Sequence, residues 1–422
     1  MPFHAIGTVR ASELIRFELA EAVLALAAPV VAFALYRARA RLLTEPLFGA
    51  VIWLSCTELL SVALDTPLSK GRLVQAGLPI VAVGGIVAAG AAGKLHVILG
   101  GLLRGGVVAL ALAASGFTLN VLGLLELPGA FVFRSAHPIF PALPRMTGTF
   151  GTHAVWLGEY CILLLAVALG AGKEAGSRLL RGGTALAAAS ALLLSFSFAW
   201  LGGLVLAAAA LLRHLSPARS VRRIVWLGVA VVYLAACWLV LVGMPLETRV
   251  EAPRPCGELD RLHHVTRPTG PGRCAPVLSA VPYWHRVTLY ALAHATALES
   301  FARNPLLGSS RRRYPELATE RARSVYGIEN HGFYTEPIGL IAGSLARGAT
   351  GAGGLLLVLW GVWRARPCEP GSPRRDAWAF YGTVALLLTA TNSDFALRGT
   401  LWVAVGWLIA RIRNAPSKLY TA

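Results

Sequence analysis

The sequence predicts an all-α polytopic membrane protein with about eleven or twelve transmembrane helices. Apolar residues make up 56% of the chain and charged residues only 14%, whereas a soluble domain carries roughly 25% charged residues. Apolar stretches of about 17–22 residues recur, each long enough to cross a bilayer as a helix. We expect these spans to be helical because a helix satisfies its own backbone hydrogen bonds in lipid.

The first apolar stretch, residues 17–36, is expected to be a retained span. Glu13, Glu18 and Glu21 precede or enter it, and no small-residue cleavage site follows it. A cleaved signal peptide would instead have a basic start and such a site. The chain therefore begins, on this interpretation, with a first transmembrane helix.

Ten further apolar stretches are expected to span the membrane. Within residues 75–126, Lys94, His96 and Arg104 interrupt the apolar sequence, so a twelfth span there is left open. The ten stretches are 48–64, 75–93, 105–126, 153–171, 183–198, 199–212, 224–243, 351–364, 377–392 and 399–412.

Basic residues gather in short connections between these spans and in the C-terminal tail. By the positive-inside rule, such connections lie in the cytoplasm, which puts residues 127–152, 244–350 and about 392–398 on the outer side. The net charge of +18 reflects this distribution, so it gives no reason to expect nucleic acid as a partner. The four connections are RARAR at 37–41, KEAGSRLLR at 173–181, RHLSPARSVRR at 213–223 and RARPCEPGSPRR at 364–375.

The chain accordingly divides into N-terminal helices (1–243), a large outer loop (244–350) and C-terminal helices with a cytoplasmic tail (351–422). Residues 244–336 carry twelve arginines and no lysine. The planar fork of arginine binds phosphate oxygens bidentately, so this usage predicts oxyanion binding. For any single arginine, contact with lipid headgroups or with the nine acidic residues of the segment is the alternative.

Three motifs on the outer side each place a cationic or imidazole side chain close to an apolar helix. In this order and topology they resemble the O-antigen ligase and polymerase superfamily of bacterial envelope glycosyltransferases, over about residues 140–365. The motifs are RMTGTF from Arg145 to Phe150, Arg286 followed by an apolar stretch ending in NPLLG at Asn304–Gly308, and HGFY at His331–Tyr334 before a helix with Gly348 and Gly351.

The resemblance implies a GT-C-like membrane fold, with one long periplasmic loop between the eighth or ninth span and the last three. It implies a glycosyltransferase that moves a polysaccharide from undecaprenyl pyrophosphate to the lipid A-core oligosaccharide. The reaction would occur on the periplasmic face of the bacterial inner membrane, in contact with membrane lipids. An O-antigen polymerase, whose acceptor is a second lipid-linked glycan, is the alternative within the superfamily. A lipid or anion transporter is the alternative from another class.

The resemblance also assigns roles to residues. His331 is expected to be the base and to act with Arg286, while Arg145 and Arg286 hold the donor pyrophosphate. Pyrophosphate is a good leaving group, so cations that stabilise its charge and one base are sufficient without a carboxylate pair. No metal or cofactor is expected. For His331, capping of the next helix or a hydrogen bond to Glu336 is the alternative. The residues expected to line the acceptor pocket are Asn330, Tyr334 and Glu336.

Two positions depart from the family pattern. Gly332 follows His331 where the family has asparagine, and Ser197 is followed by Phe198 where the family often has arginine. One phosphate-binding arginine is therefore missing at the end of that span. Arg303 and Arg311 are the candidates to supply it.

The cysteines predict one disulfide. Cys256 and Cys274 both lie in the outer loop, where the compartment is oxidising. Their pairing would close a short loop worth about 3 kcal/mol in the chain-entropy model. The other four cysteines fall in spans or on the cytoplasmic side and are expected to be free.

A few acidic residues are further candidates. Glu258 and Asp260 are the only outer acidic pair with metal-ligand spacing, and a solvated turn is the simpler interpretation. Glu58 and Glu159 lie inside predicted spans, where a carboxylate is a functional candidate by default. A structural hydrogen bond is the equal alternative for both.

Overall fold

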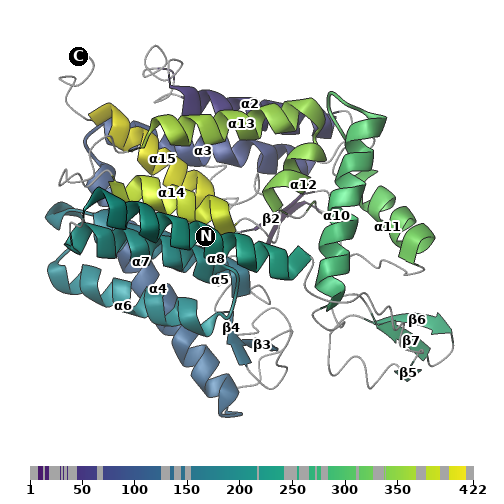
Figure 1. Ribbon diagram of the computed structural model, residues 1–422, viewed down its shortest axis with the longest axis horizontal. Helices are drawn as coiled ribbons and strands as arrows, with labels where there is room; N and C mark the ends of the chain where they lie inside the picture. Colours follow the sequence, from purple (N-terminus) through teal and green to yellow (C-terminus); the bar gives the residue numbers. More distant parts are fainter. Residues whose placement is uncertain are drawn as a thin grey trace.

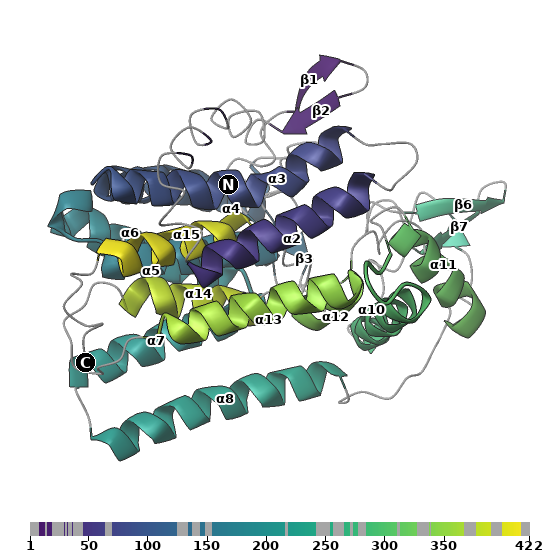
Figure 2. The ribbon, with the colours of Figure 1, turned by 90° about the horizontal axis from the view of Figure 1, so that it is seen from above.

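A computed structural model shows a predominantly helical protein with three small antiparallel sheets among the described residues (Figure 1 and Figure 2). The all-α prediction is confirmed at this level, since the strands are only two to five residues long. The structure describes residues 8–12, 15–18, 29, 32, 36, 45–63, 70–124, 134–136, 144–147, 154–215, 218–241, 254–255, 266–270, 273–276, 284–309, 313–326, 337, 339–366, 377–389 and 399–414.

The helices and strands follow in chain order. The helices are α2 (Pro46–Ala63), α3 (Lys70–Ala91), α4 (Leu95–Val121), α5 (Ala154–Gly170), the 3-10 turn η2 (Lys173–Ala175), α6 (Arg178–Leu194), α7 (Ala199–Leu215), α8 (Arg219–Leu241), α10 (Trp284–Arg303), α11 (Arg313–Tyr326), α12 (Gly339–Leu345), α13 (Gly348–Arg364), α14 (Ala377–Thr389) and α15 (Gly399–Asn414). The strands are β1 (Thr8–Ser12), β2 (Ile15–Glu18), β3 (Arg134–Ala136), β4 (Pro144–Met146), β5 (Arg254–Pro255), β6 (Thr266–Gly270) and β7 (Arg273–Pro276). The sheets are β1–β2, β3–β4 and β5–β7–β6.

Ten of the eleven predicted spans coincide with helices of the structure: α2 to α8 and α13 to α15. The first predicted span was placed wrongly at its start, because Phe17 and Glu18 belong to strand β2 and pair with β1. Most of the rest of that span lies outside the described residues. By length and hydropathy, one described helix, α4, qualifies to cross a membrane, and six shorter helical segments are apolar over 10–17 residues.

The interrupted stretch at 75–126 contains two helices, α3 and α4, and its described part, residues 75–124, holds no third helix. They meet at a tight turn in which Gly93 adopts φ 70°. The amide of Lys94 donates to the carbonyl oxygen of Ala89 at 2.7 Å, which is the closing hydrogen bond of a glycine-terminated helix. Arg104 is exposed on α4, so a charged side chain does not end that helix.

Helix α5 lies at the centre of the main helical bundle. Of its 17 residues 13 are buried, and it packs against α4, α6, α7 and α14. Small residues permit these close crossings: a Cβ on Gly202 of α7 would lie 2.6 Å from the Ile162 side chain of α5. Trp402 and Trp407 of α15 are among the largest fully buried side chains.

The outer helices α6 and α8 present large apolar side chains outward. On α6, Leu179, Leu186 and Leu193 are 86%, 71% and 62% exposed, whereas Ala188 and Ala191 are buried. Helix α8 lies along one side of the bundle in Figure 2 and also carries large exposed aliphatic residues, among them Ile224 and Leu227. A bundle that folds in water would place these side chains the other way round.

One end of the bundle is basic. We call it the basic end; it carries η2, the connection from α7 to α8 and the last turn of α13. Exposed cationic side chains lie on each of these segments, including Lys173, Arg178, Arg213, Arg223 and Arg364.

The other end of the bundle, which we call the motif end, is defined by the direction of the helices. Helix α6 leaves the basic end and α7 returns to it, so their junction lies at the motif end. Helix α13 runs towards the basic end, so the α12–α13 corner also lies at the motif end. Figure 1 shows α10, α11 and α12 together on this side.

A second, smaller apolar cluster joins α10, α11 and α12. Ala297 of α10, Tyr314 and Ala318 of α11, and Ala342 of α12 form its buried centre with Ala346. The Tyr314 hydroxyl donates to the carbonyl oxygen of Ala293 at 3.0 Å. The described helices of the predicted outer loop thus have a core of their own, beside the main bundle.

Candidate functional site

Arg145 is a buried cation at the motif end. It lies on β4, opposite Ser135 of β3 in the hairpin register, and is 7% exposed. Strand β4 packs against α4, α5 and α6. The Nε of Arg145 donates to the carbonyl oxygen of Ser195 at 3.1 Å, which fixes the plane of the guanidinium at the end of α6.

The junction between α6 and α7 is irregular in backbone conformation and is held by several hydrogen bonds. Phe196 has φ 41°, a left-handed conformation that costs a non-glycine residue of order 1–3 kcal/mol unless the surroundings enforce it. The hydroxyls of Ser195 and Ser197 lie 2.9 Å apart, and the Trp200 indole donates to the carbonyl oxygen of Leu192 at 2.7 Å. Such a strained, hydrogen-bonded corner points to a constrained site rather than a plain loop.

Arg145 therefore brings a guanidinium to the α6–α7 junction, which also contains Phe198. Sequence reasoning placed Arg145 among the anion-binding residues but could not place it beside Ser195 and Ser197. Helix α5 also approaches this junction, since a Cβ on Gly158 would lie 2.8 Å from the Ser197 hydroxyl. Glu159, the next residue of α5, is 3% exposed.

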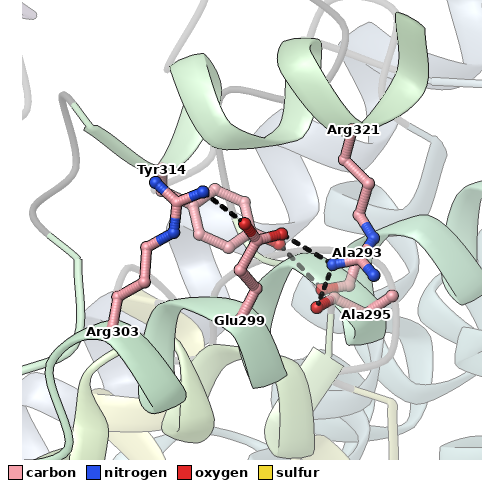
Figure 3. A network of polar contacts seen from close by, with 6 residues as sticks. All are labelled: Ala293, Ala295, Glu299, Arg303, Tyr314 and Arg321. Atoms are coloured by element: carbon pink, nitrogen blue, oxygen red, sulfur yellow. Dashed lines mark hydrogen bonds and ion pairs between the residues drawn. The ribbon is translucent and has the colours of Figure 1, made fainter. Parts of the chain in front are cut away.

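Arg303 has an acidic partner on its own helix. Its Nη2 lies 2.6 Å from Glu299 Oε1, and the Nη1 of Arg321 lies 2.6 Å from Glu299 Oε2 (Figure 3). Arg321 also donates to the carbonyl oxygen of Ala295 at 3.1 Å. This arrangement matches the alternative in which an arginine of the outer loop pairs with a nearby carboxylate.

Arg286 and Arg303 lie at opposite ends of α10. Seventeen residues separate them on a continuous helix, which corresponds to about 25 Å along its axis. The structure describes neither the Arg286 side chain nor Arg311, so the set of arginines expected to bind pyrophosphate stays a prediction.

The NPLLG motif has a structural role that the sequence did not reveal. Residues 304–309 pack backbone to backbone against residues 346–350, and we call this contact the clasp. The amides of Ser309, Ala349 and Thr350 donate to the carbonyl oxygens of Ala346, Pro305 and Leu306 at 2.9, 2.7 and 3.1 Å, respectively. The clasp fixes the C-terminal end of α10 to the α12–α13 corner.

Two glycines make the clasp possible. Gly308 and Gly348 have φ of 64° and 65°, conformations that favour glycine. A Cβ on Gly308 would lie 1.9 Å from the carbonyl oxygen of Ala346, and one on Gly348 would lie 2.6 Å from that of Leu306. Gly308 of the second motif and Gly348 of the helix after the third motif are therefore both required for the same backbone contact.

A buried ion pair lies next to the clasp and was missed from the sequence. Arg347 Nε lies 2.7 Å from Glu58 Oε2, and their side chains are only 6% and 5% exposed. Glu58 was a candidate by its position in a span, but its partner is 289 residues away. One feature of the sequence could have indicated the pair. Arg347 is the single charged residue in the apolar-rich sequence IAGSLARG, and an ionisable residue in such sequence usually has a partner.

The third motif lies outside the described residues. So do the expected acceptor-pocket side chains, the possible metal pair Glu258 and Asp260, and Cys256. Pro337, which follows the motif, is buried, and α12 begins two residues later at Gly339. The residues outside the described part include the predicted base His331 and the expected pocket residues Asn330, Tyr334 and Glu336.

The cysteine predictions are tested in part. Cys56 and Cys161 are free, as predicted. Cys274 lies on β7 in register with Arg254 of β5, while its predicted partner lies beyond the described strands. In the part of the chain that the structure describes, no group of three or more His, Cys, Asp or Glu residues is arranged to hold a metal ion.

Comparisons with known proteins give no relative. No family model, no curated protein and no solved structure matches the chain. Functional inference therefore depends on the sequence motifs and on the geometry around Arg145, the clasp and the Glu58–Arg347 pair.

Proposed function

We propose that the protein is a polytopic membrane glycosyltransferase that uses a polyprenyl-pyrophosphate-linked glycan as donor. The preferred reaction is ligation of the glycan to lipid A-core on the periplasmic face of the bacterial inner membrane. The observation that carries the proposal is the buried Arg145 beside the irregular Ser195–Ser197 junction, at the end of the bundle opposite the basic connections.

The outward apolar residues support the membrane part of the proposal. Leu186 of α6 and Leu227 of α8 are 71% and 65% exposed, which suits contact with lipid acyl chains. At the basic end, the Arg366 guanidinium lies 4.0 Å from the centre of the Trp363 ring. Tryptophan and arginine at helix ends are typical of the lipid headgroup region, so the basic end would be cytoplasmic.

Arg145 suits the stabilisation of a departing pyrophosphate. A buried guanidinium interacts more strongly with developing negative charge than one in water, because the surroundings screen it less. Its Nε hydrogen bond to Ser195 holds its plane before substrate binds. Preorganised donors of this kind contribute typically 10²–10³-fold to the rate.

His331 is the base in this proposal, and Arg286 is a second cation near the leaving group. A neutral imidazole can accept the proton of an acceptor hydroxyl. Departure of the polyprenyl pyrophosphate breaks the glycosidic C–O bond as the acceptor oxygen forms the new one. The proton of the acceptor hydroxyl passes to the imidazole.

The polymerase reaction is the alternative at the same site, since it differs only in the acceptor. The Glu58–Arg347 pair favours a second class, a lipid or anion transporter, because transporters often carry ionisable residues within the bundle. A transporter would move a lipid-linked glycan across liposomes without forming a new glycosidic bond.

The test is reconstitution of the purified chain in liposomes with an undecaprenyl-pyrophosphate-linked glycan. With lipid A-core added, we expect glycan-bearing lipid A-core on a gel. Longer lipid-linked glycan without any modified lipid A-core would establish the polymerase instead. Translocation of the donor with no new glycosidic bond would establish the transporter and overturn the enzyme assignment.

A further inference from the structure

The buried face of α2 changes in chemistry along its length. Leu47, Val51 and Leu54 are buried in its first half, followed by Ser55 and Glu58 in its second half. Residues three or four apart lie on one face of a helix. The inner face of α2 is thus apolar towards the basic end and polar towards the motif end.

Arg347 meets this polar section from the α12–α13 corner. It is the residue that precedes α13, and its Nε and Nη1 donate to Glu58 Oε2 and to the carbonyl oxygen of Gly343 at 2.7 and 2.6 Å. Gly351 makes room for the side chain, since a Cβ there would lie 2.4 Å from the Arg347 Cβ. The guanidinium is therefore fixed by two helices at once.

Stability alone is a poor reason for such a pair. Two charges lose their hydration on burial, and replacement of a buried ion pair by apolar residues of similar size is often neutral or stabilising. The pair instead fixes an orientation, because the hydrogen bond between Arg347 and Glu58 forms in only one orientation of the α12–α13 corner relative to α2. The neighbouring Trp53 indole of α2 adds a second such link by donating to the carbonyl oxygen of Thr350 at 2.8 Å.

The corner is also the point at which α10 and α12 are attached. The carbonyl oxygen of Ala346, adjacent to Arg347, accepts from the Ser300 hydroxyl at 2.8 Å and from the Ser309 amide at 2.9 Å. A change in the orientation of Arg347 would therefore move the clasp. It would also move α12, the helix that follows the His331 motif in the chain.

We infer that Glu58 and Arg347 are positioning residues that orient the α12–α13 corner against α2, and with it the helix next to the catalytic motif. The inference concerns orientation and rests on the proposed function only for its effect on turnover. It assigns a role to α2, a helix that none of the three motifs includes.

The structural part is tested without any activity assay, by hydrogen exchange of the purified protein in detergent. In Glu58→Gln, which keeps the shape but removes the charge, we expect amides of residues 339–347 to exchange at least about tenfold faster through local opening. Amides of α15 should be unchanged. The matched control is Glu174→Gln, an exposed glutamate at the basic end. Unchanged exchange in 339–347 would overturn the inference.

The functional part uses turnover and an apolar double variant. We expect Glu58→Gln to lower kcat by about ten- to a hundredfold with the donor KM nearly unchanged, because small misplacements affect the reacting geometry first. Glu58→Leu combined with Arg347→Met should recover the thermal stability but not kcat. Recovery of both would mean that the pair only fills space, and would overturn the inference. If the wild-type protein transfers no glycan, the proposed function fails and hydrogen exchange alone decides the positioning role.

Discussion

The two ends of the bundle hold arginine in different ways. At the basic end, Arg364 and Arg366 are exposed and lie over the rings of Trp360 and Trp363, with guanidinium-to-ring distances of 5.6 and 4.0 Å. Such contacts at exposed sites contribute only about 0.5–1 kcal/mol each. These arginines set the charge of one end of the molecule, and any one of them is replaceable.

At the motif end, Arg145 and Arg347 are 7% and 5% exposed. Each is fixed by a named acceptor, the carbonyl oxygen of Ser195 for one and the Glu58 carboxylate for the other. The difference teaches that the exposed arginines contribute charge to the basic end, whereas function is to be sought in the buried cations.

The largest expected effect on stability is at the clasp. Gly308→Ala should lower the free energy of unfolding by about 3–5 kcal/mol, because the left-handed conformation and the contact with Ala346 both oppose a Cβ. Gly93→Ala at the basic end is the matched control. Gly93 has a similar φ of 70° but open space around its Cβ position, so it should lose only about 1–2 kcal/mol. Equal losses in thermal unfolding would show that the clasp adds nothing.

The predicted topology places cysteines in two redox compartments, so their oxidation states should differ. Cys256 and Cys274 should be joined, and their reduction should cost about 3 kcal/mol in the chain-entropy model. Cys368, in a basic connection, should remain a free thiol. Peptide mass spectrometry without reductant checks all three. Free thiols at both 256 and 274 would contradict the outer placement of that loop.

A smaller effect is expected at the start of α6. The Ser177 hydroxyl accepts a hydrogen bond from the Leu180 amide at 3.1 Å and caps the helix. Ser177→Ala should cost about 1 kcal/mol of stability and leave transfer unchanged. Chemical unfolding and the transfer assay check this together. A loss of transfer would mean that the basic end takes part in the reaction.

The smallest effect on transfer is expected for an arginine of the motif end that is not buried. Arg303→Gln should change the rate by less than about twofold, because an exposed ion pair contributes little and Arg321 still contacts Glu299.

At the other end of α10, Arg286→Lys should impair transfer badly if the guanidinium of Arg286 binds pyrophosphate through two parallel hydrogen bonds. A reversal of this order, measured in the same liposome assay, would move the anion site to the C-terminal end of α10.

The sequence predicted the helices well, and the contacts between them poorly. Apolar length alone placed α5 and α7 close to their observed bounds, because a helix is a local structure. It could not decide the region of α3 and α4, where a left-handed glycine at 93 sets the boundary. At the first span it missed strand β2, because the pairing with β1 overrides the apolar pattern at Phe17.

The candidate site shows the same limit. Arg145 was identified from a local motif, but its contact with Ser195 joins segments 50 residues apart. The pairing of Glu58 with Arg347 depends on packing of α2 against α13 and leaves no local pattern. The NPLLG motif predicted only a resemblance, whereas its backbone contact at Gly308 appears only in three dimensions.

In the proposed reaction, the buried and oriented Arg145 guanidinium at the motif end stabilises the departing pyrophosphate. The direct measurement compares Arg145→Lys with Arg178→Lys, the same substitution at an exposed position of the basic end, in the liposome transfer assay. We predict that Arg145→Lys lowers kcat by about a hundredfold or more, since lysine keeps the charge but loses the fork. Arg178→Lys should remain within about twofold of the wild type. Near-normal transfer by correctly folded Arg145→Lys would contradict the account.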